Sequence, residues 1–200
     1  VYGGNIKQPF SIDDAVIDPV SLYAATKRSG ELMVQSYAHL YGFPSTGLRF
    51  FTVYGPFGRP DMAYYSFTKA IWEGQPIRVN NAGRMKRDFT YIDDIVDGIV
   101  AVRDAVPEQG GAHCIAGQAH RVLNLGNNQP TSLMRFIEII EQSLGQEAQK
   151  EMVDLPAGDV LETYADIDAS QEVLGYQPKW TLEEGIPQFV EWYKGYYKDL

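Results

Sequence analysis

The chain has 200 residues, and its 17 Lys plus Arg against 26 Asp plus Glu give a formal net charge of −9. Hydrophobic residues make up 44 % and charged residues 22 %, a globular composition that excludes a disordered chain. The acidic balance argues against nucleic acid as a partner, because phosphate neutralisation needs clustered Lys and Arg. No apolar run approaches the roughly 20 residues that span a bilayer, so we expect no membrane segment.

The single cysteine and the first residues bear on where this protein belongs. Cys114 has no partner for an internal disulfide, which favours a reducing compartment, so we expect a cytoplasmic protein. The opening Val1-Tyr2-Gly3 is typical of a strand that enters a turn. We therefore expect the N-terminal part of a longer protein to precede it.

Breakers, capping residues and apolar periodicity predict an alternation of helices and short strands. In chain order we expect a loop over 3–20, a helix over 21–41 between Ser21 and Gly42, a doubly buried strand over 46–53, a helix over 64–73, strands at 77–79 and 88–92, a helix from its cap Asp93 to 105, a strand at 122–125, a helix over 132–144, a strand at 151–154 and a helix from the capping box at Thr181 toward 197. This order predicts an α/β fold, with parallel strands. The break after Phe51 is the expected border between a piece of a parallel-sheet domain, residues 1–53, and a smaller α/β domain, residues 54–200, some of which returns to the first sheet.

Two Tyr-x-x-x-Lys motifs are candidates for acid–base chemistry. Tyr23 and Lys27 form one, and Tyr65 and Lys69 form the other. Residues four apart are neighbours on a helix face, and a cation near a phenol favours the phenolate. Each pair is therefore a way to make a base, and the spacing alone does not choose between them.

The sequence around Tyr23 does choose. Val-Tyr-Gly stands upstream, and Leu-Arg-Phe-Phe-Thr-Val-Tyr-Gly-Pro at 48–56, Arg-Asp-Phe-Thr-Tyr-Ile-Asp-Asp at 87–94 and Gly-Asp-Val at 158–160 stand downstream. This ordered set resembles the extended short-chain dehydrogenase/reductase family, in its nucleotide-sugar epimerase and dehydratase branch, and is most similar to the UDP-glucuronate 4-epimerases. The resemblance implies that 1–53 is the C-terminal remnant of an NAD-binding Rossmann domain and that 54–200 mainly binds the nucleotide sugar.

The resemblance implies NAD as the cofactor and assigns three residues next to it. Tyr23 matches the base that takes the proton from the sugar C4 hydroxyl while hydride passes from C4 to NAD. Lys27 matches the residue that favours the phenolate and holds the nicotinamide ribose, and Phe51 matches a strand-end aromatic that meets the cofactor. The glycine-rich loop and the catalytic Ser or Thr of the family would precede Val1.

The resemblance also assigns a UDP-sugar site. Arg87 matches the arginine that grips the pyrophosphate, and Asp159 matches the acid near the uridine ribose. Thr52 and Arg59 flank a proline-stiffened turn, so we expect both to face one pocket beside Tyr23 and to bind a sugar carboxylate.

Two positions depart from the family pattern. Asn80 stands where relatives carry an aromatic, which weakens the expectation of stacking on uracil. Pro156 stands where UDP-glucose 4-epimerases place a second phosphate-binding Arg, so that contact must come from elsewhere. His113, Cys114 and His120 have no common zinc spacing, and we expect no metal.

The expected function is NAD-dependent C4 epimerisation of UDP-glucuronate to UDP-galacturonate through a 4-keto sugar. UDP-glucose 4-epimerase, UDP-glucuronate decarboxylase and 4,6-dehydratase remain alternatives within the family. A non-catalytic NAD-sensing or structural relative is the alternative of another class. By analogy with the family we expect a homodimer, and we expect the 200 residues alone to be inactive.

Overall fold

The computed structural model describes residues 1–156 and 158–198. Its helices are α1 (Leu22–Tyr41), α2 (Ala63–Trp72), α3 (Ile92–Asp104), α4 (Leu133–Leu144), α5 (Asp168–Leu174) and α6 (Leu182–Tyr196), with a 3₁₀ turn η1 (Asn81–Gly83). Its strands are β1 (Ser45–Phe50), β2 (Thr52–Tyr54), β3 (Ile77–Asn80), β4 (Lys86–Tyr91), β5 (His120–Leu125), β6 (Pro130–Ser132) and β7 (Lys150–Val153). The predicted α/β class is confirmed.

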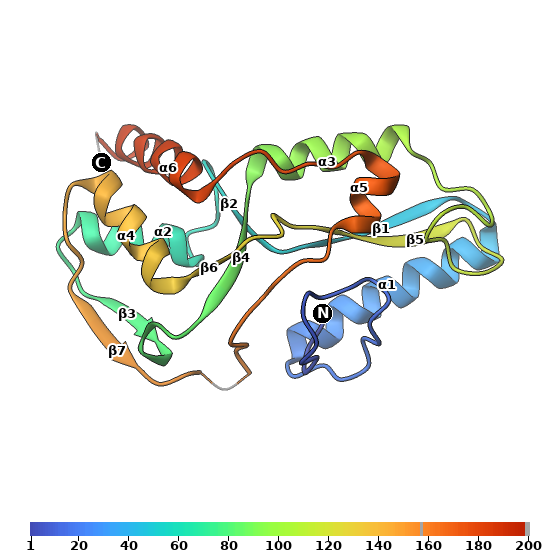
Figure 1. Ribbon diagram of the computed structural model, residues 1–200, viewed down its shortest axis with the longest axis horizontal. Helices are drawn as coiled ribbons and strands as arrows, with labels where there is room; N and C mark the ends of the chain where they lie inside the picture. Colours follow the sequence, from blue (N-terminus) through green and yellow to red (C-terminus); the bar gives the residue numbers. More distant parts are fainter. Residues whose placement is uncertain (157, 199–200) are drawn as a thin grey trace.

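The strands form three small sheets, arranged as two lobes along the long axis (Figure 1). In one lobe β1 pairs in parallel with β5, with α1 on one side and α3 and α5 on the other. In the other lobe β3 pairs in parallel with β7, close to α2, α4 and α6. Between them, β4 pairs in parallel with β2 and antiparallel with β6. β5 thus returns from the second half of the chain to the sheet of the first.

The long helix α1 begins and ends where its sequence predicts. The Ser21 hydroxyl accepts a hydrogen bond from the Ala24 N–H at 3.1 Å, which satisfies a free donor of the first turn. Gly42 ends the helix with φ 68°, and its N–H donates to the Ala38 carbonyl. Glycine adopts this left-handed conformation without steric cost. These caps fix the position of the first turn of α1, which carries Tyr23.

The segment 46–53 differs from the expected doubly buried strand. The chain breaks at Phe51, so that β1 and β2 belong to different sheets. In β1 the buried side chain is Arg49, while Phe50 is 48 % exposed. Within the described residues β1 pairs along one edge only. The strand β1 therefore has a neighbouring strand on one edge, whereas a central strand has one on each edge.

Two further boundaries depart from the sequence reading. Asp93 lies in the first turn of α3, and the N-cap is Tyr91, because β4 runs directly into the helix. The short elements β6 and α5 were not predicted, since three and seven residues carry too little periodicity.

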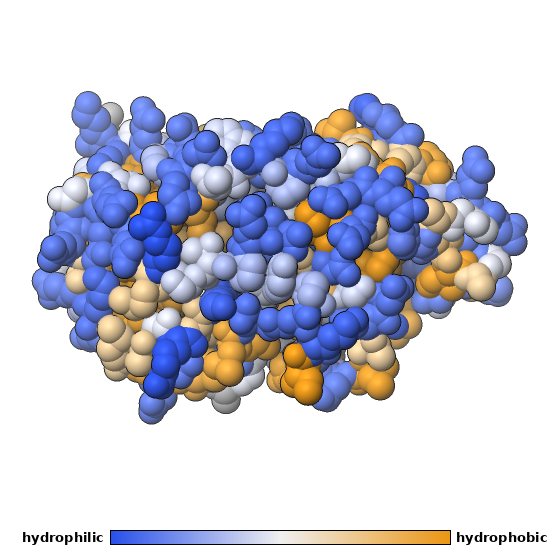
Figure 2. Space-filling view, viewed as in Figure 1, coloured by the Kyte–Doolittle hydropathy of each residue, from blue (hydrophilic) through white to orange (hydrophobic). Residues whose placement is uncertain are grey.

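The main core fills the second lobe. It gathers the large buried side chains Tyr54, Ile77, Val79, Phe89, Phe136, Ile140, Ile186, Phe189 and Tyr193. Phe89 and Phe136 stack with ring centroids 4.5 Å apart, and this contact joins β4 to α4. The surface in Figure 2 is mostly hydrophilic with scattered apolar patches. Among the described helices, none combines the length and hydropathy needed to cross a bilayer.

Candidate active site

The first candidate feature is the Tyr23–Lys27 pair on the first turns of α1. The Tyr23 side chain is 67 % exposed, and the Lys27 Nζ lies 5.1 Å from the centre of its ring. The competing residue Tyr65 is buried, its hydroxyl hydrogen-bonds that of Tyr197, and burial raises its pKa. A phenol that is 6 % exposed and already hydrogen-bonded to another hydroxyl is a poorer base for a substrate than an exposed one, so the structure favours the first pair.

The second candidate feature is a polar cavity of about 480 Å³ formed where β2, β3 and β4 meet. Its lining combines charged and amide side chains with an apolar floor, from Thr52, Asp61, Met62, Ala63, Phe67, Arg78, Asn80, Met85, Arg87, Phe89, Leu133 and Asp159. Apolar walls with a few convergent polar groups are typical of small-molecule sites of this size. Three of the predicted substrate residues, Thr52, Arg87 and Asp159, are thus brought together.

The Arg87 guanidinium is fixed at the wall of this cavity. Its Nη2 donates to Asp159 Oδ1 at 2.7 Å, and its Nη1 donates to the Lys86 carbonyl oxygen at 2.9 Å. Burial lowers the pKa of Arg87, and the neighbouring Asp159 carboxylate opposes that shift. An arginine keeps its charge in proteins, so it is a pre-positioned cation for an anionic ligand.

The loop of Asp159 lies against the segment that leads into α1. A Cβ on Gly158, whose φ is +80°, would lie 3.4 Å from the Val20 carbonyl oxygen. Val20 stands three residues before Tyr23. The loop that carries the cavity residue Asp159 therefore approaches the chain just before the helix of Tyr23.

Arg59 does not join the cavity as expected. Its side chain is 72 % exposed, and its Nη2 donates to Asp61 Oδ2 at 3.2 Å. Arg59 is not among the residues that line the cavity with Thr52. Its guanidinium pairs instead with the carboxylate of Asp61, two residues along the chain.

Phe51 is half-buried between the two lobes. Its ring lies 6.2 Å from that of Tyr2 and 6.5 Å from that of Phe10, in a small cluster with the N-terminal loop. The contact with this loop anchors the junction of β1 and β2. A cofactor contact of Phe51 stays a prediction.

Sequence reasoning missed Asp88, the residue next to Arg87. Its carboxylate is fully buried and accepts backbone N–H groups of Asn127 at 2.8 Å, Asn128 at 3.1 Å and Ala165 at 2.9 Å. Burial raises its pKa, and these three donors oppose the shift. An acid inside a strand, directly before the aromatic Phe89, was the signal that could have found it.

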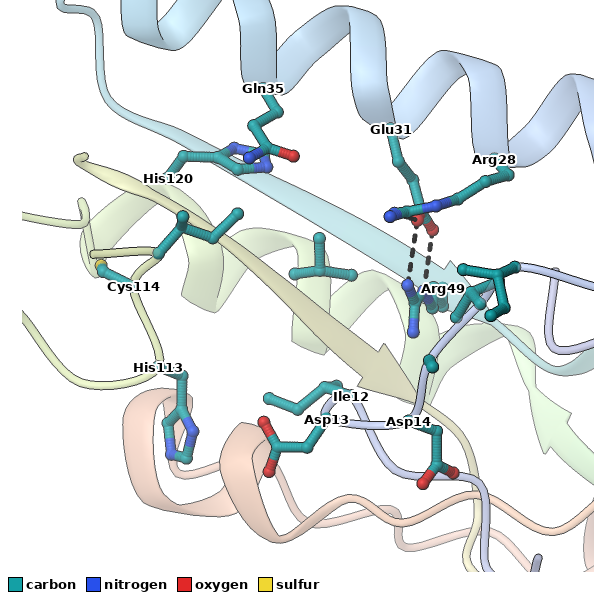
Figure 3. A pocket seen from close by; sticks show the side chains of 15 residues that line it. Ile12, Asp13, Asp14, Arg28, Glu31, Gln35, Arg49, His113, Cys114 and His120 are labelled. Atoms are coloured by element: carbon teal, nitrogen blue, oxygen red, sulfur yellow. Dashed lines mark hydrogen bonds and ion pairs between the residues drawn. The ribbon is translucent and has the colours of Figure 1, made fainter. Parts of the chain in front are cut away.

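A second hollow of about 420 Å³ lies between α1, β5 and the loop over 12–17 (Figure 3). Glu31 and Arg49 form a two-bonded ion pair at its wall. The His113 Nε2 atom lies 3.0 Å from Glu172 Oε2, so the partner of this ring is a glutamate and not the neighbouring Cys114. Across residues 1–156 and 158–198, no three His, Cys, Asp or Glu side chains are grouped to hold a metal ion.

The fold and the site define an α/β protein with a cavity that holds a fixed arginine and with an exposed Tyr–Lys pair. Residues 1–117 match the profile of the NAD dependent epimerase/dehydratase family, and the chain belongs to this family. The predicted family is thereby confirmed.

Individual relatives agree with this assignment. Protein CapI of Staphylococcus aureus is 52 % identical over 99 % of this chain and 61 % of its own length. A probable UDP-glucuronate 4-epimerase of Rhizobium meliloti (strain 1021) is 45 % identical over 99 % of this chain and 60 % of its own length. The chain is also similar to a crystal structure of UDP-glucuronic acid 4-epimerase from Bacillus cereus in complex with UDP-glucuronic acid and NAD, with 32 % identity and a TM-score of 0.85 over 97 % of this chain and 59 % of that one. The chain thus spans about three fifths of the length of these relatives.

Proposed function

We propose that this chain carries the UDP-sugar site and the acid–base pair of an NAD-dependent 4-epimerase that interconverts UDP-glucuronate and UDP-galacturonate. The observation that carries the proposal is the approach of Gly158, the neighbour of the cavity residue Asp159, to Val20, three residues before Tyr23. The similarity to UDP-glucuronate 4-epimerases supports the substrate.

The residues present fit NAD as the cofactor. Tyr23 is exposed with Lys27 beside its ring, so a phenol and an ammonium are both free to contact a ribose hydroxyl. When bound, NAD supplies the acceptor and donor of a hydride at the sugar C4. In the mechanism, this chain's own part is to hold and move the C4 hydroxyl proton.

Tyr23 is the proposed general base. With the Lys27 ammonium 5.1 Å from the centre of its ring, Tyr23 takes the proton from the C4 hydroxyl on its phenol oxygen as the 4-keto sugar forms. The same phenol returns the proton after the ketone has turned its other face. Because the proton leaves and returns at one oxygen atom, a single residue serves both half-reactions.

The cavity holds the rest of the substrate. The Arg87 fork suits phosphate oxygens of the UDP, and Asp159 accepts hydrogen bonds from ribose hydroxyls once the ligand competes for it. Thr52 lines the same cavity and offers a hydroxyl to the sugar. Arg59 binds the C6 carboxylate after it exchanges Asp61 for the substrate acid, a like-for-like exchange of carboxylates.

The test uses Tyr23→Phe and Tyr65→Phe in the complete enzyme. Tyr23→Phe removes the proton-transferring oxygen and should lower kcat by roughly 10²- to 10⁴-fold with nearly unchanged UDP-sugar affinity. Tyr65→Phe is the matched control, since it alters a buried tyrosine of the other Tyr-x-x-x-Lys motif. A crippling effect of Tyr65→Phe alone, or carbon dioxide release with UDP-xylose as the main product, would overturn the proposal.

A further inference from the structure

The charged groups of the substrate cavity are unevenly paired. Asp159 is paired with Arg87 at 2.7 Å, and Asp61 is paired with Arg59 at 3.2 Å. Arg78 also lines the cavity, yet within the described residues no carboxylate lies within ion-pair distance of it. Arg78 is thus an arginine of this cavity that makes no ion pair with the described residues, although Glu151 is its register partner on β7 and Asp154 lines the adjoining hollow.

The strand that carries Arg78 directs it away from the core. Its neighbours Ile77 and Val79 are 2 % and 0 % exposed and point into the main core. Side chains alternate along a strand, so Arg78 and Asn80 share the opposite face. Both also line an adjoining hollow of about 900 Å³ along β3 and β7, with Met152 among its walls. Arg78 therefore stands where the substrate cavity continues into this second hollow.

We propose that Arg78 binds the diphosphate of the sugar nucleotide, as a second cation beside Arg87. This inference rests on the proposed function, because it takes the cavity to hold a UDP-sugar. A diphosphate carries more than one negative charge, and the Asp159 carboxylate already offsets part of the Arg87 charge. A guanidinium binds phosphate oxygens through two parallel hydrogen bonds, which suits an arginine that makes no ion pair with the described residues. The long side chain reaches the cavity from β3, whereas Arg87 reaches it from β4.

Calorimetric titration of the complete enzyme with uridine and with UDP tests the proposal. Arg78→Gln should weaken UDP binding about 10- to 100-fold, the scale of losing a charge-assisted hydrogen bond, and leave uridine binding within about twofold. Arg84→Gln is the matched control, because Arg84 is an exposed arginine of the same region that lines neither hollow. It should bind both ligands like the unaltered enzyme.

The outcomes separate this inference from the proposed function. If the unaltered complete enzyme binds UDP and Arg78→Gln binds it equally well, Arg78 is no phosphate ligand and the proposed function stands. An equal loss of uridine and UDP would also refute the phosphate contact, since the change would then have altered the pocket as a whole. If the unaltered complete enzyme binds neither ligand, the proposed function fails and the inference fails with it.

Discussion

The ion pair between Glu31 and Arg49 is expected to hold α1, the helix that carries Tyr23, on its sheet. Glu31 lies on α1, two turns after Tyr23, and Arg49 lies on β1. Arg49 donates to both carboxylate oxygens, at 2.7 and 2.9 Å, and Arg28 donates a further bond at 2.8 Å. The side chains of Glu31 and Arg49 are only 14 % and 7 % exposed. The pair is therefore largely shielded from water, unlike an ordinary surface salt bridge.

Glu31→Gln should destabilise the chain by about 3 kcal/mol, the lower end of the range for removing one partner of a buried pair. The lower end applies because the pair borders the hollow in Figure 3 and keeps some contact with solvent. The loss arises because the Arg49 charge stays buried without its counter-ion. With a urea slope of about 2 kcal/mol per molar, the unfolding midpoint should fall by roughly 1.5 M.

Urea unfolding followed by circular dichroism measures this change. Adding Arg49→Met to Glu31→Gln should recover at least about 1 kcal/mol relative to the sum of the single changes, because the unpaired charge disappears. Asp104→Asn breaks the fully exposed Arg103 pair and should leave the midpoint unchanged. A shift of Glu31→Gln no larger than that of Asp104→Asn would refute the reasoning.

Acid should remove the stabilisation that the Glu31–Arg49 ion pair gives to the folded chain. Burial raises the pKa of Glu31, but the hydrogen bonds and charges of Arg49 and Arg28 outweigh it, so the folded pKa lies below the ordinary 4.5. The stabilisation is fully present above the unfolded pKa and is lost as pH falls through the lower, folded one. The difference in unfolding free energy between the unaltered chain and Glu31→Gln should therefore shrink below about pH 4.5.

Two further predictions concern specificity and assembly. Arg59→Ala in the complete enzyme should cost roughly 2–3 kcal/mol in kcat/KM for UDP-glucuronate, because the sugar carboxylate loses its charge partner. The loss for UDP-glucose, which has no carboxylate, should be far smaller. Equal losses in steady-state assays of both sugars would exclude a carboxylate contact. Met33 is 60 % exposed on α1 among other exposed apolar side chains, so Met33→Glu should convert the expected homodimer to monomers in analytical ultracentrifugation, whereas an unchanged sedimentation coefficient would place the interface elsewhere.

The sequence predicted the long elements because their signals are local. α1, α4 and α6 were delimited by a capping residue or capping box whose hydrogen bonds the structure shows. An apolar run does not reveal how many strands flank it, and among the described residues β1 pairs along one edge only. The buried residue of β1 is Arg49, and its guanidinium is bound by Glu31 on α1. This contact between two elements cannot be seen from the strand sequence alone.

The candidate site could be predicted only as far as motifs reach. Tyr23 and Arg87 stand in recognisable motifs, and the structure places both where a ligand has access. Arg78 stands in no motif, and its place in the cavity follows from the path of β3 alone. The side-chain direction of Arg59 was not predictable either. The sequence does not show whether this side chain pairs with Asp61, two residues along the chain, or points into the cavity.

Buried carboxylates explain how separate segments of chain are brought to one cavity. Asp88 collects N–H groups from the loop after β5 and from Ala165, and it is covalently next to Arg87. Asp94, at the start of α3, does the same for the N–H groups of Lys179 and Trp180, at 2.9 and 3.1 Å, just before α6. Burial raises the pKa of both acids, so each is held at some cost, and the backbone donors that oppose the shift come from distant segments. A hydrophobic contact is not directional, whereas a carboxylate with fixed donors sets the path of each loop it binds. The hydrogen bonds that Asp88 accepts therefore fix the position of its neighbour Arg87, in addition to the pairing of the strand that carries both residues.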